Sequence, residues 1–167
     1  MKKLKLNCWR YRHYTDIYIY HTSPDLSKLL SILHCFFDQQ LILILELHDE
    51  INFTAMGSIT QDAKIFHISR NRCIVFCNQD KFMTMLHLIG IHVIEELFIA
   101  NLNHNEPSEN LINFLKYSAA FIVKKGISDI ALSIRFPEKE MIISFSKERY
   151  SDIFVKNAIT GLLKEKM

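Results

Sequence analysis

Hydrophobic and polar residues alternate with a period of two near the amino terminus. Residues 3–12 and 16–22 both follow this alternation, which is typical of strands with one buried face. The polar segment between them predicts a hairpin with a two-residue turn at Tyr14 and Thr15. The resulting register predicts three pairs on one face of the hairpin: Trp9 with Tyr20, Tyr11 with Tyr18, and His13 with Asp16. The other face would carry Arg10, Arg12, Ile17 and Ile19.

A helix and several short strands are predicted next. Ser23, Pro24 and Asp25 form a helix-start signal, and the apolar spacing after them predicts a helix to about Asp38. The run LILILEL at 41–47 is apolar on both faces and predicts a buried central strand. Three further runs predict strands: INFTAMGSI at 51–59, KIFHIS at 64–69 and RCIVFC at 72–77.

The apolar period changes to that of a helix after Asn78. Apolar residues recur at helical spacing from Phe82 to Ala100, so we predict one long helix there. A second helix should begin near Pro107 and Ser108 and end at Gly126, a residue suited to a left-handed helix cap. We expect these two helices to pack as a pair.

The carboxyl-terminal part predicts a hairpin and a closing helix. A four-residue PEKE loop would pair Phe136 with Met141, Ile134 with Ile143, and Leu132 with Phe145. An amphipathic helix follows from Ser151 to about Glu165. Strands come in runs and helices come in runs, without strict βαβ alternation. We therefore predict an α+β fold: a largely antiparallel sheet built from hairpins and covered by about four helices, in a single layered domain spanning residues 1–167.

Composition is consistent with that prediction. The chain has 167 residues, of which 49% are hydrophobic and 23% are charged, as in globular rather than disordered proteins. Its formal net charge of +2 is too small to indicate nucleic-acid binding by itself. The basic charge is concentrated in the first thirteen residues, which contain no acid: Lys2, Lys3, Lys5, Arg10 and Arg12.

Targeting and membrane signals are weak. The amino terminus lacks the continuous apolar stretch of a signal peptide. The apolar window from Phe82 to Ala100 contains two histidines and two glutamates, and LILILEL is too short to cross a bilayer. We therefore expect a cytoplasmic protein with no membrane partner, whose cysteines are reduced. These are Cys8, Cys35, Cys73 and Cys77.

The sequence predicts no cofactor site and no metal site. Its four glycines are scattered, whereas phosphate-binding loops need them clustered. Cys73 and Cys77, four residues apart on a strand, would lie roughly 13 Å from each other and cannot share an ion. His92 shares a predicted helix face with Glu95 and Glu96, but a salt bridge or a solvated face explains that spacing better than a metal.

Candidate catalytic groups do not converge in the sequence. Asp49 and Glu50 form an acidic pair in a predicted turn, His34 adjoins Cys35, and His13 could pair with His67 only through the fold. No residue is identified as catalytic. We expect a protein without enzymatic activity.

The first hairpin carries the clearest surface signal. One interpretation is that its aromatic side packs under a helix; the other is that it is exposed and binds a partner. Trp, Tyr and Arg are enriched in protein-binding hot spots. Alternatively, the rings could stack on the bases of single-stranded RNA while Lys3, Lys5, Arg10 and Arg12 contact phosphates. The predicted partner-binding residues are Trp9, Arg10, Tyr11, Arg12, His13, Tyr18 and Tyr20.

The remainder of the chain is nearly neutral and has acids at positions 46, 49, 50, 95, 96, 106 and 109. This favours a protein partner, because carboxylates near the hairpin would repel a nucleic-acid backbone. The composition suggests an AT-rich gene. Our hypothesis is a small bacterial immunity or antitoxin-type protein that binds and neutralises a cognate toxin. Single-stranded RNA binding is the alternative. Charge argues against the first choice, since an inhibitor of a basic nuclease would preferably be acidic.

Overall fold

The computed structural model describes residues 4–50, 63–102 and 107–164. Four α-helices are found in these ranges: α1 (Leu26–Phe36), α3 (Gln79–Ile89), α4 (Glu109–Ser118) and α5 (Asp152–Leu163). Two 3-10 helices are η1 (Ile91–Val93) and η2 (Ala119–Phe121). The strands are β1 (Lys5–Arg10), β2 (Tyr14–Tyr20), β3 (Gln40–Leu47), β4 (Lys64–His67), β5 (Arg72–Asn78), β6 (Ile94–Asn101), β7 (Ile130–Arg135) and β8 (Glu140–Ser146).

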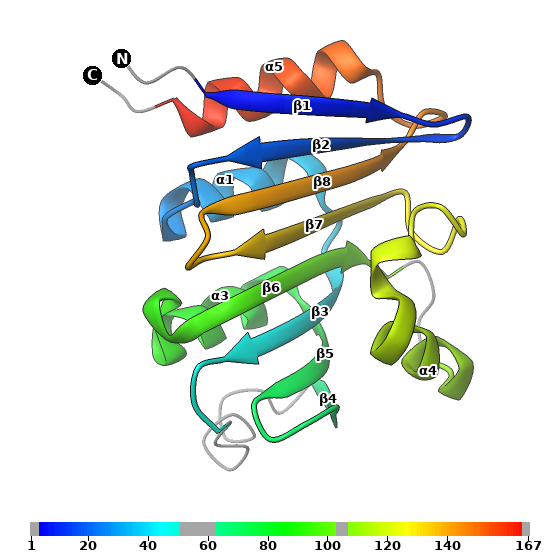
Figure 1. The fold of residues 1–167 in the computed structure, drawn as a ribbon. Coiled ribbons are helices and arrows are strands. Elements are labelled where there is room, and N and C mark those ends of the chain that lie inside the picture. The colour runs from blue at the N-terminus through cyan, green and yellow to red at the C-terminus, as the bar shows by residue number, and fades with distance from the viewer. Residues whose placement is uncertain (1–3, 51–62, 103–106, 165–167) are drawn as a thin grey trace.

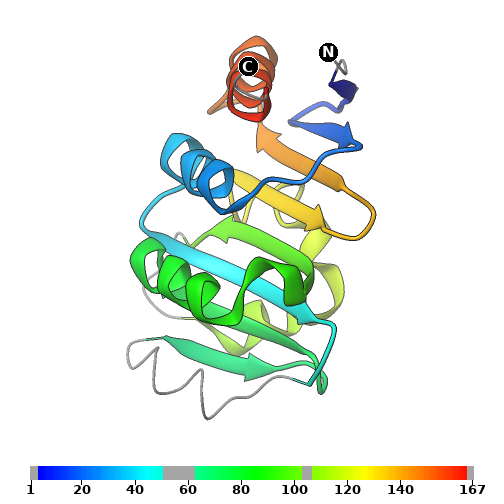
Figure 2. The same cartoon turned by 90° about the vertical axis from the view of Figure 1, so that its left-hand side faces the viewer.

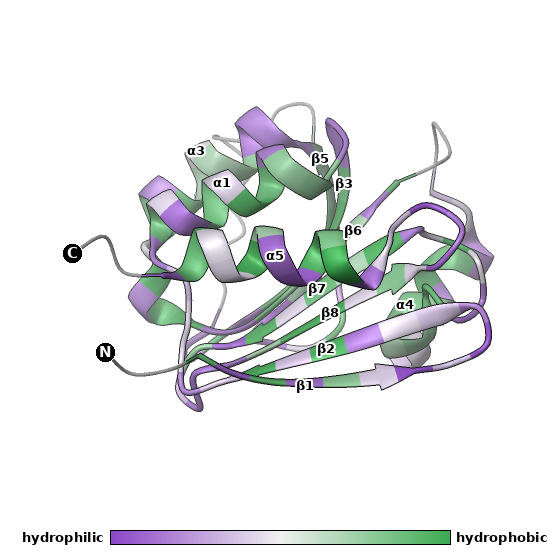
Figure 3. Ribbon diagram, turned by 90° about the horizontal axis from the view of Figure 1, so that it is seen from above, coloured by the Kyte–Doolittle hydropathy of each residue, from purple (hydrophilic) through white to green (hydrophobic). Residues whose placement is uncertain are grey.

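These strands form one sheet in the order β1-β2-β8-β7-β6-β3-β5-β4, and every neighbouring pair is antiparallel (Figure 1). Helices α1, α3 and α5 lie together on one face of the sheet (Figures 2 and 3). Helix α4 and η2 lie against the other face, over β3 and β5. The predicted α+β class, with its antiparallel sheet and four helices, is confirmed.

Each face of the sheet has its own apolar cluster. Under α1, α3 and α5, the larger cluster takes the inward residues of nearly every strand, such as Ile17, Leu43 and Ile143. Under α4, the smaller cluster is confined to the middle of the sheet and includes Ile44 and Leu115. Strand β3 is therefore buried on both faces, as its unbroken apolar run predicted. The part of the second face over β2, β8 and β7 lies beside α4 and not beneath it (Figure 1).

Polar side chains cap all four described α-helices. The side chains of Asp25, Asn78, Ser108 and Ser151 each accept a hydrogen bond from the backbone N–H three residues on. Such caps satisfy N–H groups that have no partner inside the helix. Three of these starts were predicted from the sequence, at the beginning of α1, α4 and α5, although the cap of α1 is Asp25 and not the hydroxyl of Ser23.

The predicted long helix from Phe82 to Ala100 is wrong. Helix α3 ends at Ile89, and Gly90 has a φ of +83°, which only glycine adopts readily. One turn of η1 then leads into β6, which pairs with both β3 and β7. Backbone hydrogen bonds to two neighbouring strands override the helical spacing of the apolar residues. Helices α3 and α4 do not pack as a pair, because they lie on opposite faces of the sheet.

The predicted register of the first hairpin is also wrong, by four residues. Trp9 lies opposite Asp16, and Lys5 lies opposite Tyr20. The turn occupies residues 11–13, where the Tyr11 N–H donates to the Tyr14 carbonyl at 2.9 Å. His13 therefore belongs to the turn and does not pair with Asp16. A shift by an even number of residues preserves the faces, so Trp9 and the β2 tyrosines still share one side.

The carboxyl-terminal hairpin forms, with a register two residues from the prediction. Its pairs are Ile134 with Met141, Leu132 with Ile143, and Ile130 with Phe145. The loop is Phe136 to Lys139 rather than PEKE, and Lys139 has a φ of +53°. This hairpin brings β8 against β2, so the second and last described strands in sequence become neighbours.

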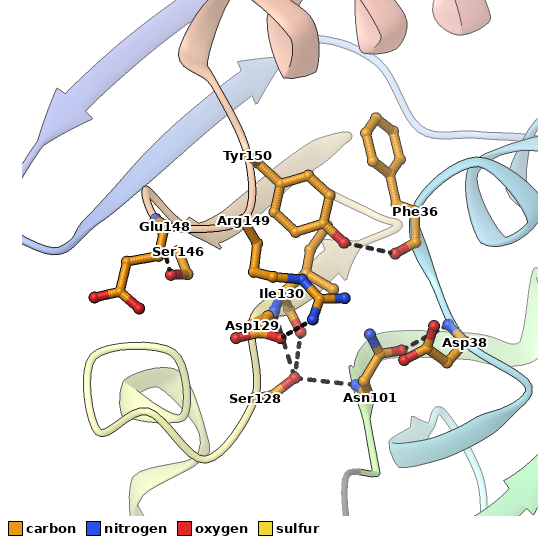
Figure 4. Close-up of polar contacts among 10 residues, drawn as sticks. All are labelled: Phe36, Asp38, Asn101, Ser128, Asp129, Ile130, Ser146, Glu148, Arg149 and Tyr150. Atoms are coloured by element: carbon orange, nitrogen blue, oxygen red, sulfur yellow. Dashed lines mark hydrogen bonds and ion pairs between the residues drawn. The ribbon is translucent and has the colours of Figure 1, made fainter.

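A polar junction ties strand ends to helix α1 (Figure 4). The Tyr150 hydroxyl donates to the Phe36 carbonyl at 3.2 Å, and the buried Ser128 hydroxyl donates to the Ile130 carbonyl at 2.8 Å. The Asn101 side-chain oxygen accepts from the Asp38 N–H at 2.9 Å. Because each contact joins a buried or half-buried side chain to a backbone group, the junction satisfies polar atoms inside the fold. We assign it a structural role.

Candidate functional site

The second face of the sheet contains a groove between β2 and η2. We call it the sheet groove; its volume is about 380 Å³. Strands β2, β8, β7, β6, β3 and β5 all contribute side chains, and η2 forms one wall. The lining residues are Tyr11, Tyr14, Asp16, Tyr18, Ile44, Glu46, Arg72, Glu96, Leu97, Phe98, Ala119, Ala120, Phe121, Ala131, Ser133, Ile142 and Ser144.

Small side chains explain why the groove exists. Ala131 and Ser133 on β7, and Ser144 on β8, lie at the centre of its floor. The register places Ser133 between Ile142 and Phe98, and Ser144 between Asp16 and Ala131. Side chains on one face of neighbouring strands lie about 5 Å apart. The larger side chains of β2 and β6 therefore extend further from the sheet than the small ones between them, which leaves a groove over β7 and β8.

Aromatic rings form the walls. Tyr11 and Tyr14 stack with ring centroids 4.4 Å apart and planes 11° from parallel. Tyr18 and Phe98 lie in the same cross-strand row, separated by Ile142 and Ser133. Tyr11 is 42% exposed and Phe121 on the opposite wall is 52% exposed. Both rings can therefore contact a bound molecule.

Asp16 is a half-buried carboxylate in this aromatic setting. The Ser144 hydroxyl donates a hydrogen bond to it at 2.6 Å. Burial raises the pKa of Asp16 above its ordinary value, and the Ser144 hydrogen bond partly opposes that rise. Burial, followed by the charge of Asp16, also raises the pKa of Tyr14 and Tyr18. Among the described residues, no lysine or arginine forms an ion pair with Asp16.

The other acids of the groove have cationic neighbours. Glu46 lies 3.8 Å from Arg72 Nε, and Glu96 lies 3.1 Å from Arg135 Nε. Glu46 and Glu96 are directly opposite each other on β3 and β6. The Arg72 Nε is buried and has no hydrogen-bond partner. The lining has three carboxylates and one guanidinium. With the Arg135 guanidinium beside Glu96, one of the three carboxylates, Asp16, is left without a cationic neighbour among the described residues, although the chain as a whole is slightly basic.

The structure places four of the predicted partner-binding residues in the groove or on the sheet face that adjoins it. Tyr11 and Tyr18 line the groove. Trp9 is 57% exposed at the β1 edge, at the register position opposite Asp16. Tyr20 continues the same face beyond Tyr18, with a centroid distance of 6.4 Å, and the Lys5 ammonium lies 5.6 Å from its ring.

The remaining three predicted residues lie away from the groove. Arg10 points to the helix-covered side, where it forms an ion pair with Asp152 at the start of α5. Arg12 and His13 are exposed in the turn. The interpretation that the aromatic side packs under a helix does not hold for Trp9 and Tyr11. The buried face of β2 carries Thr15, Ile17 and Ile19 instead.

Reasoning from the sequence missed several groove residues. Tyr14 and Asp16 were placed in or beside a turn, although their alternation with Tyr18 was a usable signal for one face of a strand. Glu46 is an isolated charge in an apolar strand, which is an unusual position for a solvated acid. Nothing local distinguishes Glu96, Phe121 or Arg72, because only the sheet order brings them here.

The structure separates the candidate metal and catalytic groups. His92 is in η1 and Glu95 and Glu96 are consecutive strand residues that point to opposite faces, so the predicted shared helix face is wrong. Glu95 instead lies 3.7 Å from His48. His13 and His67 belong to opposite edges of the sheet. Within the described ranges, no group of three His, Cys, Asp or Glu side chains could hold a metal ion.

Three further predictions concern the acidic pair, the strand at 51–59 and membrane spans. Asp49 and Glu50 are exposed. The strand predicted at 51–59 lies outside the described residues. In the part of the chain that the structure covers, the helices are too short or too polar to traverse a bilayer.

Comparisons with known proteins give little. The sequence matches no protein-family model, and no curated protein matches it. Among solved structures, the TBP of Methanococcus jannaschii is similar over 75% of this chain and 93% of that chain, with 13% sequence identity and a TM-score of 0.20. At this TM-score we infer neither fold nor function from the similarity.

Proposed function

We propose that the protein is a binding module without catalytic activity and that it holds a protein partner on the second face of its sheet, in the sheet groove. One observation carries this proposal: a groove with exposed aromatic walls and three carboxylates lies on the second face of the sheet, beside α4 and bounded by η2. Grooves with apolar walls and a few converging polar groups are the usual form of binding sites.

The composition of the surface supports a protein partner. Trp9, Tyr11 and Phe121 are large, rigid side chains that can bury much area with little loss of conformational freedom. They lie along the groove and the adjoining edge of β2 and β1. A partner segment that enters the groove would cover these rings together.

The charges disfavour the RNA alternative. Asp16, Glu46 and Glu96 line the groove and would repel a phosphate backbone. Arg10, one of the proposed phosphate contacts, is occupied by Asp152. Lys5 and the exposed Arg12 are the described remainder of that basic set.

The narrower proposal is an immunity or antitoxin-type role. In that case the groove would cover functional residues of a cognate toxin, with no turnover and no cofactor. The net charge of the chain argued against an inhibitor of a basic toxin, but the local charge of the groove is of the complementary sign. This proposal rests on charge complementarity.

A pull-down with matched variants tests the proposed function. Ser133→Trp fills the centre of the groove, while Thr84→Trp adds the same side chain at an exposed position of α3, on the helix-covered side. Tagged wild type and both variants are incubated with source-cell lysate, with and without nuclease, at low and high salt. We expect a stoichiometric protein that survives nuclease and is retained by wild type and Thr84→Trp but lost by Ser133→Trp.

Two results would contradict the proposal. Equal retention of the protein by Ser133→Trp would place the binding surface elsewhere. Recovery of nucleic acid that disappears with salt, and of no protein, would favour the RNA-binding alternative.

A further inference from the structure

We infer that the sheet groove receives the side chain of an arginine from the protein partner, with Asp16 as the carboxylate that binds it. This inference rests on the proposed function and specifies the chemistry of the same site. It starts from the one groove carboxylate for which the described residues provide no cation.

The three groove acids differ in their surroundings. Glu46 has Arg72 and Glu96 has Arg135 within ion-pair distance. Asp16 has the Ser144 hydroxyl, which occupies one carboxylate oxygen at 2.6 Å. The other oxygen has no hydrogen-bond donor among the described residues. A half-buried carboxylate in this state is stabilised by a cation that enters from the groove.

The walls determine which cation fits. A guanidinium is planar, is weakly hydrated and stacks on aromatic faces, whereas an ammonium is compact and strongly hydrated. The Tyr11 and Tyr14 rings are stacked beside Asp16, and Phe121 lies on the opposite wall. The groove therefore offers a carboxylate between ring surfaces, which suits arginine better than lysine.

The volume is consistent with this ligand. A groove of about 380 Å³ is at the lower end of the range of small-ligand pockets, roughly 300–1,000 Å³. It can hold one long side chain and part of its backbone. The small residues of the floor, Ser133 and Ala131, leave the depth that the side chain needs.

The test is a titration followed by NMR. ¹⁵N-labelled protein is titrated with the peptide acetyl-Gly-Arg-Gly-amide and with matched peptides that carry lysine or citrulline in place of arginine. Citrulline retains the shape of arginine but has no charge. We expect saturable shifts of amide signals at Tyr14, Tyr18 and Ser144 with the arginine peptide, weaker shifts with lysine, and none with citrulline.

Variants assign the effect to Asp16. Asp16→Asn removes the charge while it can keep the Ser144 hydrogen bond, and should weaken arginine binding about tenfold or more. Asp80→Asn, the same change at an exposed position in α3 on the helix-covered side, should bind like wild type. Phe121→Ala removes an exposed wall residue that the core does not need, and should also weaken binding.

Equal binding of the arginine and citrulline peptides, wild-type affinity of Asp16→Asn, or no saturable binding of any peptide would overturn the inference. The proposed function fails separately, because its test is partner capture by Ser133→Trp. A partner that is lost with Ser133→Trp but bound normally by Asp16→Asn would leave the groove as the binding surface and exclude the arginine contact.

Discussion

At the scale of single residues, the most informative position is Asp16. Its neighbours on the same face of β2 are Tyr14 and Tyr18, and its cross-strand partner on β8 is Ser144. Burial makes the charged form less favourable than in the unfolded chain, which raises the pKa of Asp16. A folded protein that retains such a group sacrifices stability at neutral pH. Binding sites commonly show this property.

Replacement of Asp16 by asparagine should therefore stabilise the free protein at pH 7. The folded state has the raised pKa and binds the proton more tightly than the unfolded state, so the cost of ionisation develops as the pH rises through the interval between the unfolded and folded pKa values. The gain should disappear below the ordinary aspartate pKa, where wild type is protonated in both states. Urea unfolding at pH 7 and pH 3 measures the difference.

The control for this prediction is Asp80→Asn. Asp80 is an acid in the first turn of α3, where it interacts favourably with the helix dipole. Its loss should lower the free energy of unfolding at pH 7 by about 0.3–1 kcal/mol. A loss of stability in Asp16→Asn at pH 7 would contradict the argument from burial.

At the scale of elements, Gly90 decides where α3 stops and β6 begins. Its φ of +83° lies in the left-handed region, and a Cβ at this position would lie 2.7 Å from His92 Cε1. The apolar spacing from Phe82 to Ala100 continues across this glycine without interruption, which is why the spacing alone predicted one helix. The change of chain direction at Gly90 allows residues 94–101 to form β6, which pairs with β3 and β7.

Gly90→Ala should destabilise the fold by about 1–2 kcal/mol, because an L-residue is strained at positive φ. Gly161→Ala is the matched control. Gly161 is inside α5, and the added Cβ would have no described heavy atom within 4 Å. This change should be neutral or stabilise the protein by up to about 1 kcal/mol. Thermal unfolding of both variants tests the prediction, and equal melting temperatures would contradict it.

At the scale of the whole molecule, the centre of the sheet is covered by an apolar cluster on each of its two faces. Strand β5 pairs with β3 and β4, and its residues contribute to both apolar clusters. Cys73 and Cys77 are buried on the side of α1 and α3, and burial raises the pKa of each to about 12. We therefore expect their thiols to ionise and react only when the central sheet opens.

Alkylation should therefore distinguish the four cysteines. At pH 8 with iodoacetamide, exposed Cys35 and half-buried Cys8 should react in the folded protein, although burial raises the pKa of Cys35 and slows it. Cys73 and Cys77 should react only at the rate of global unfolding, and rapidly in denaturant. Mass spectrometry of peptides measures each site. Fast labelling of Cys73 in the folded protein would show that the centre of the sheet opens locally.

The amino-acid sequence by itself determined features that depend on neighbours along the chain. Asp25, Ser108 and Ser151 start helices because a side chain caps N–H groups three residues away. The alternation in β2 places its tyrosines on one face whatever the register, since side chains alternate in any strand. The apolar residues on both faces of β3 predicted that it is a central strand of the sheet.

Only the tertiary structure decided the strand identity of residues 94–101, the two hairpin registers and the composition of the groove. Asp16, Glu46 and Glu96 come from three strands far apart in sequence, and the order β2-β8-β7-β6-β3 brings them into one cavity. Local sequence patterns do not predict which strands pair, because pairing depends on the burial of both faces of the sheet at once. The groove follows from that global arrangement, together with the small residues that it places on β7 and β8.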